Sequence, residues 1–209
     1  MKNLVKTILT VLTVMLLLSA TSCNPKSSLA KKLEGTWATN SEAVDYPGAL
    51  HASAVRVLQF NTDSNIDRPT GGDMMISIML NVTTMAPASD SVVQPYSISS
   101  SAIAAIQGSW KAIDDDEILV DLNPQTFTVD VDPQAVTQND NILTGENFST
   151  VDSLKPALAS EIKRQIQTGC LQKLLSVKKI EDIEFRKDGT MKCEINDTDF
   201  HFHSQSQTD

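Results

Sequence analysis

Two histidines near the end of the chain carry the side chains best suited to bind a metal ion. His201 and His203 flank Phe202 in a predicted strand, so both imidazoles lie on one face of it. No third ligand stands at a matching spacing, and zinc sites use three or four protein ligands. An exposed edge strand close to the terminus explains the pair better, so we expect no metal site and no cofactor.

Acidic and nucleophilic side chains do not form a recognisable catalytic group either. The run from Asp114 to Glu117 lacks the alternating oxygen ligands and the glycine of a calcium loop, so we expect a solvated turn there. His51 has no identifiable nucleophile near it in the sequence. Gly-x-Ser-x-Gly, His-Glu-x-x-His and glycine-rich phosphate motifs are missing. We therefore expect that the protein is not an enzyme.

The first residues of the chain have the pattern of an export signal. Lys2 and Lys6 form a positive start, residues 8–18 are almost entirely apolar, and residues 19–22 are small. This apolar run is too short to span about 30 Å of hydrocarbon comfortably, so it predicts a removable signal segment. Cys23 follows at once.

Ala20-Thr21-Ser22-Cys23 resembles the lipobox of bacterial lipoproteins. The resemblance implies that residues 1–22 are removed and that Cys23 is acylated, with palmitate-type chains holding the protein on a membrane. Asn24 stands where an aspartate favours the inner membrane, which implies an outer membrane and a domain facing the periplasm. We expect residues 23–32 to be a lipidated polar tether; secretion with a chance cysteine is the alternative.

Cys170 and Cys193 are the other two of the three cysteines. Neither belongs to a Cys-x-x-Cys pair, which excludes zinc-ribbon and thioredoxin-like sites. If the predicted helix packs on the predicted hairpin, both sulfurs face one core. The sequence is compatible both with a disulfide between these two cysteines and with a pair of buried free thiols.

Length and charge limit what the chain can do. Of 209 residues, 187 remain after the signal segment, enough for one domain, which we place at 33–205. The formal net charge is −9, and the loss of Lys2 and Lys6 takes it to −11. Such a surface repels nucleic acid, so nucleic-acid binding is excluded.

Alternating side chains predict a largely antiparallel β protein. The clearest strand is 74–84, where Ile76, Ile78 and Leu80 share one face and Met75 and Met79 share the other. Either face could point inward. Further strands are predicted at 53–61, 92–99, 107–113, 118–122, 126–131, 180–186, 190–196 and 199–204.

One segment changes to helical periodicity. Apolar residues recur every four positions from Leu154 to Ile166 within 153–178, which predicts a long amphipathic helix with a break at Gly169. After it, the register of apolar side chains predicts a three-residue turn at 187–189, with Gly189 left-handed and Phe185 opposite Met191.

Gly35-Thr36-Trp37 and Gly108-Ser109-Trp110 resemble the Gly-x-Trp motif of lipocalins and of the lipocalin-like lipoproteins common in Bacteroidetes. The resemblance implies a lipocalin-like antiparallel barrel, or a strongly curved sheet, with both tryptophans bordering the interior. Lipocalins place their helix after the last barrel strand, whereas here it precedes three strands. Two functions remain: binding of a small hydrophobic ligand, or a structural or partner-binding role with a solid core.

Overall fold

The computed structural model describes residues 24–46, 50–86, 96–138 and 146–205. In chain order the elements are α2 (Pro25–Leu33), β1 (Gly35–Thr39), β2 (Glu42–Tyr46), β3 (Leu50–Thr62), β4 (Gly71–Ala86), β5 (Tyr96–Ala112), β6 (Ile118–Leu122), η1 (Pro124–Thr126), β7 (Thr128–Val131), η2 (Pro133–Ala135), β8 (Thr137–Gln138), α3 (Glu146–Leu175), β9 (Lys179–Phe185), β10 (Thr190–Glu194) and β11 (Asp199–Ser204).

Eight strands form a closed antiparallel barrel in the order β1-β11-β10-β9-β6-β5-β4-β3. The barrel closes because β1 pairs with β11 on one side and with β3 on the other. The predicted fold class is thereby confirmed: a mainly β protein with one long helix, α3, inserted before the last three strands. None of the helices in the described ranges is both long and apolar enough to cross a lipid bilayer.

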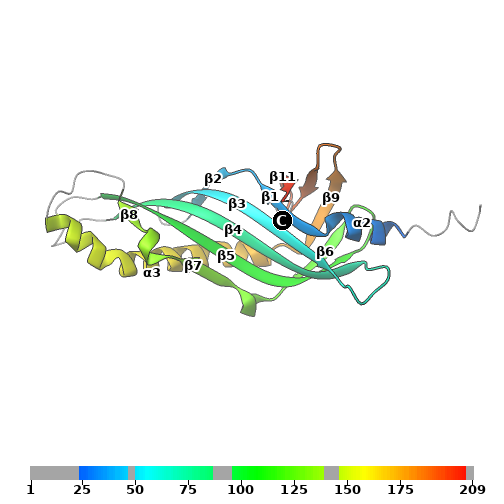
Figure 1. Ribbon diagram of the computed structural model, residues 1–209, viewed down its shortest axis with the longest axis horizontal. Helices are drawn as coiled ribbons and strands as arrows, with labels where there is room; N and C mark the ends of the chain where they lie inside the picture. The colour runs from blue at the N-terminus through cyan, green and yellow to red at the C-terminus, as the bar shows by residue number, and fades with distance from the viewer. Residues whose placement is uncertain (1–23, 47–49, 87–95, 139–145, 206–209) are drawn as a thin grey trace, which may run out of the picture.

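The three longest strands, β3, β4 and β5, continue beyond the barrel as an open sheet. There β2 extends the sheet at the first half of β3, and β7 and β8 pair with the first half of β5. Helix α3 runs behind this sheet along the long axis, with α2 at the opposite end of the molecule (Figure 1). The inner face of the sheet is therefore covered by the barrel walls at one end and by α3 at the other.

Period-two alternation decides which side of the long strands faces inward. Ile76, Ile78 and Leu80 of β4 are buried, whereas Met79 on the other face is 50% exposed. The β-branched and leucine side chains thus form the inner wall. On α3 the predicted stripe is also buried, at Ile162, Ile166, Cys170 and Leu174.

Two predicted interruptions are wrong. Strands at 92–99 and 107–113 are instead one strand, β5, from Tyr96 onward; residues 92–95 lie outside the described ranges. Pairing with β4 along almost its whole length keeps the strand continuous, and small inward residues such as Ala102 and Ala104 leave room for α3. Helix α3 also continues through Gly169, because the buried stripe on both sides outweighs the roughly 1 kcal/mol that a helical glycine costs.

The segment before β1 differs from the expected tether. Pro25–Leu33 form helix α2, whose first turn is capped by the Asn24 side chain accepting a hydrogen bond from the Lys26 N–H. Leu29, Ala30 and Leu33 are spaced to share one helical face, and that face is buried. Residues that look polar in composition therefore belong to the packed body.

The predicted β9–β10 turn is confirmed. Gly189 has φ +81°, and Phe185 lies opposite Met191. Beyond this pair the ladder shifts by one residue at a bulge, where Asp182 has φ +51°. The turn sets the apolar face of the hairpin toward the barrel interior, where Met191 and Cys193 are fully buried.

Candidate ligand-binding site

Two pairs of aromatic side chains pack together on the barrel strands. The Trp37 ring meets Phe185 edge-on with centroids 5.6 Å apart, and Trp110 meets Phe60 in the same way at 5.4 Å. Both tryptophans are buried, as the Gly-x-Trp resemblance implies. One pair joins β1 to β9 and the other joins β3 to β5, so each packs aromatic rings between strands that are not direct neighbours in the barrel.

A cleft of about 240 Å³ lies where the barrel meets α3. We call it the mouth cleft. Its walls come from β3 and β4, from the last two turns of α3, and from the β10–β11 hairpin. It is lined by Val44, Arg56, Leu58, Ile76, Ile78, Cys170, Lys173, Leu174, Ser176, Val177, Ile195, Asn196, Thr198, Phe200 and Phe202.

Strand register explains why the floor of the mouth cleft is apolar. Leu58 pairs across the sheet with Ile76, and Arg56 pairs with Ile78, so these four side chains share the inner face. Leu58, Ile76 and Ile78 are all buried. The floor is thus a continuous aliphatic surface, broken only by one guanidinium.

Arg56 is the one charged residue on this inner stretch of β3. Strand β1 pairs with β3 at Val57–Phe60 and β2 pairs with it at Leu50–Ala54, so Arg56 faces the break between them. Its backbone N–H donates to Thr39 Oγ1 at 3.0 Å instead of to a strand partner. The break in the wall gives the guanidinium access to solvent.

The Arg56 side chain is held by two further contacts. Its guanidinium lies over the Phe200 ring at 4.8 Å and forms an ion pair with Glu42. Burial lowers the pKa of Arg56 below its usual value, yet arginine remains protonated at any physiological pH. The mouth cleft therefore contains a permanent positive charge beside apolar walls.

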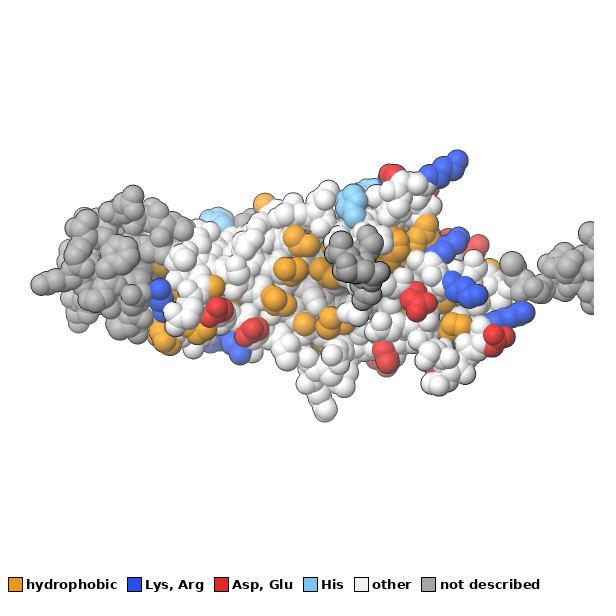
Figure 2. All heavy atoms as spheres, viewed as in Figure 1, with side chains coloured by type: hydrophobic (Ala, Val, Ile, Leu, Met, Phe, Trp, Pro, Cys, Tyr) orange, Lys and Arg blue, Asp and Glu red, His pale blue; other side chains and the backbone are white. Residues whose placement is uncertain are grey.

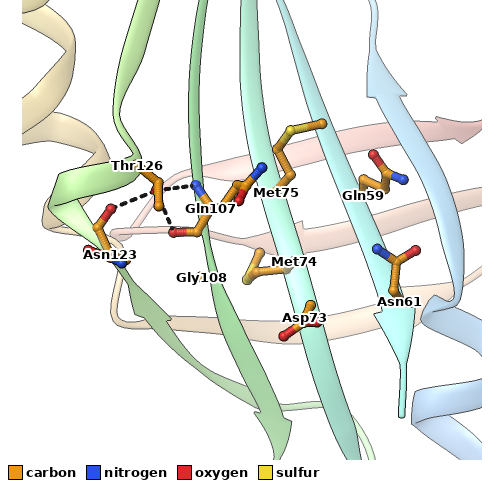
Figure 3. A pocket seen from close by; sticks show the side chains of 9 residues that line it. All are labelled: Gln59, Asn61, Asp73, Met74, Met75, Gln107, Gly108, Asn123 and Thr126. Carbon is orange, nitrogen blue, oxygen red and sulfur yellow. Dashed lines mark hydrogen bonds between the residues drawn. The ribbon is translucent and has the colours of Figure 1, made fainter. Parts of the chain in front are cut away.

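A second and larger hollow lies on the outer face of the sheet, with a volume of about 520 Å³. Figure 3 shows its side chains: Met75 lies between Gln59 and Gln107, which are its direct cross-strand neighbours. At one edge the Gln107 N–H donates to Thr126 Oγ1 at 2.9 Å. This outer groove is shallow, polar and solvated, so it does not suit an apolar ligand.

Cys170 and Cys193, predicted to share a core, are both buried. The structure holds both as thiols, and Cys170 lines the mouth cleft. Burial raises the pKa of Cys193 to about 12, so its thiol is unreactive at neutral pH. The disulfide stays a prediction.

The remaining predicted residues lie on the surface. His201 and His203 are exposed on β11, and Asp114 to Asp116 form an exposed turn. Glu117, next to that turn, forms an ion pair with Lys179. Within the described part of the chain, no group of three or more His, Cys, Asp or Glu side chains is placed to hold a metal ion. Cys23 lies outside the described residues.

No family model, curated protein or solved structure matches this chain. The geometry of the molecule is therefore the basis for its function. Arg56 and Phe200 are the residues of the mouth cleft that sequence reasoning missed. The signal was present, because Arg56 alternates with Ala54 and Leu58 and so had to share their buried face.

Proposed function

We propose that this protein is a lipid-anchored, lipocalin-like protein of the cell envelope that binds a small hydrophobic ligand in the mouth cleft. The export pattern of residues 1–22 and the lipobox-like context of Cys23 support an outer-membrane anchor and a domain facing the periplasm. The two buried Gly-x-Trp tryptophans support the lipocalin-like assignment.

One observation carries the ligand proposal: the mouth cleft joins apolar walls from three separate elements and still leaves about 240 Å³ unfilled. Protein interiors are normally packed with few voids larger than a water molecule. Sites for drug-sized ligands start near 300 Å³, so the guest is small or extends out of the cleft.

A titration with a hydrophobic dye and with fluorescent fatty-acid analogues tests the proposal. Saturable micromolar binding is expected for the wild type. Ile78→Phe fills the mouth cleft from its floor and should weaken binding, whereas Met79→Phe adds the same ring on the outer face of the same strand and should not. Ligand emission is the appropriate readout, because neither tryptophan lines the cleft. Equal binding by both variants, or no saturation, contradicts the proposal.

A structural or partner-binding role is the second candidate, and two observations favour it. Both tryptophans are buried, and each packs edge-on against a phenylalanine ring. On the outer face, Met79 and Ile103 pair across β4 and β5 and are 50% and 46% exposed. Apolar side chains gather over the middle of this face in Figure 2. If none of the added ligands binds in the titration, this role is better supported than ligand binding.

A further inference from the structure

We infer that the mouth cleft selects a ligand with an anionic head on a short apolar chain, a small amphipathic carboxylate. The head would bind Arg56 and Lys173, and the chain would lie on Leu58, Ile76 and Leu174. This inference rests on the proposed function, since it names the ligand class of the same site.

The charge of the lining points to an anion. Arg56 and Lys173 both line the mouth cleft, and none of the described side chains that line it is acidic. The whole chain has a formal net charge of −9, with 26 acidic residues against 17 lysines and arginines. Two cations thus line the pocket, and the Glu42 carboxylate that pairs with Arg56 is not among the lining residues. This charge is unlike that of the rest of the molecule and favours a negative group at this place.

The placement of Arg56 suits a carboxylate. Its guanidinium is oriented by the Phe200 ring, and a guanidinium presents five N–H donors in a planar fork that matches a carboxylate. Glu42, which is not a lining residue of the cleft, pairs with Nη1 of Arg56 and so occupies only part of that fork. Donors therefore remain for a second carboxylate coming from inside the cleft.

Glu42 is the natural competitor for this position. Its side chain is 44% exposed, against 27% for Arg56, so it can move into solvent when a ligand head arrives. Ion pairs this exposed contribute little to stability, and their loss is easily offset by a new charge-assisted hydrogen bond. In the unliganded protein, the Glu42 carboxylate thus pairs with Arg56 where the anionic head of the ligand would bind.

The apolar side of the cleft sets the size of the chain. Its volume of about 240 Å³ corresponds to roughly eight water-sized groups. Val177 and Phe202, both buried, add to the apolar lining of the cleft. A short or medium acyl chain fits this space, whereas a long one has to extend into solvent.

Calorimetric titration of the purified protein with octanoate, 1-octanol and octylamine tests the inference, because these share one chain and differ in head charge. Octanoate should bind at least about tenfold more tightly than octanol, the usual effect of one charge-assisted hydrogen bond. Octylamine should bind most weakly. Binding of none of the three contradicts the proposed function itself, whereas equal binding of octanoate and octanol overturns only the anionic-head inference.

Variants separate the roles of the charges. Arg56→Met keeps an apolar stem and should abolish the preference for octanoate over octanol; Lys173→Met should reduce it. Arg164→Met, on the exposed side of α3, is the matched control and should leave it unchanged.

Glu42→Gln is decisive even where Arg56→Met fails to fold. Removal of the competing carboxylate should tighten octanoate binding several-fold. If Glu42→Gln instead lowers the melting temperature and leaves octanoate affinity unchanged, the ion pair only stabilises the packing of β2 on β3. The inference is then wrong.

Discussion

The two buried tryptophans offer a matched test of how α2 is held on the barrel. The Trp37 indole N–H donates to the Leu33 carbonyl oxygen at 2.8 Å, in the last turn of α2. Trp110 is just as buried, yet within the described structure its indole nitrogen has no hydrogen-bond partner. Each ring also packs edge-on against one phenylalanine. Replacement by phenylalanine therefore removes a similar ring area at both positions, but only the replacement of Trp37 also removes a hydrogen bond.

The expected difference follows from that bond. A net hydrogen bond contributes about 0.5–1.5 kcal/mol, and a buried acceptor left without a partner costs about 1–3 kcal/mol. Trp110→Phe loses only packing, and it also removes a donor that was buried without a partner. We therefore expect Trp37→Phe to lower the free energy of unfolding by about 1–2 kcal/mol more than Trp110→Phe does. Each kcal/mol corresponds to about 2–4 °C in Tm for a protein of this size.

Urea unfolding followed by far-ultraviolet circular dichroism measures the difference without relying on tryptophan emission. Hydrogen exchange should in addition show faster exchange of α2 amides in Trp37→Phe and unchanged exchange in Trp110→Phe. Equal losses of stability in the two variants, or unchanged α2 protection in Trp37→Phe, would refute the idea that this hydrogen bond anchors the helix.

Three further outcomes are expected. Cys23→Ser should leave the protein without lipid and uncleaved at this site; metabolic labelling with a fatty-acid analogue checks this, and a labelled variant contradicts it. The raised pKa of Cys193 means that the folded state keeps its thiol proton while the unfolded state loses it above about pH 9, so stability should fall as the pH rises from 9 toward 12. Cys193→Ala should show a shallower fall in urea unfolding at these pH values. Ile166→Ala should cost about 2–5 kcal/mol and the exposed neighbour Gln167→Ala less than about 0.5 kcal/mol, and similar losses would disprove the packing of α3.

The sequence predicts most elements of this fold because periodicity reports which side chains are buried together. Spacing places Ile78 on one face of β4 with its apolar neighbours, although it leaves open which face points inward, and it predicts the helical stripe that carries Ile166. Local signals failed where tertiary packing overrides them. Gly169 looks like a break, but the helix around it is held by its buried stripe. Pro25–Leu33 look like a tether, but the barrel provides a surface for their apolar face.

The candidate site was harder to predict, because it is made by elements that are distant in the chain. Nothing local in the sequence shows that Arg56 meets Phe200 and Glu42, or that the end of α3 comes to lie beside them. Arg56 also lies between the stretches of β3 that pair with β2 and with β1, which the sequence does not reveal. The alternation of side chains along the strand indicates that Arg56 points inward, but only the folded chain shows that it lines a cleft.

The most direct test of the central claim is methyl NMR of isoleucine-, leucine- and valine-labelled protein titrated with octanoate. If the mouth cleft is the ligand site, chemical-shift changes should be confined to the methyl groups that line it, led by Leu58, Ile76 and Leu174. Ile103 and Leu119, exposed on the outer face, should not move. Shifts at the outer residues with none in the cleft, or no saturable shifts at all, would contradict the account.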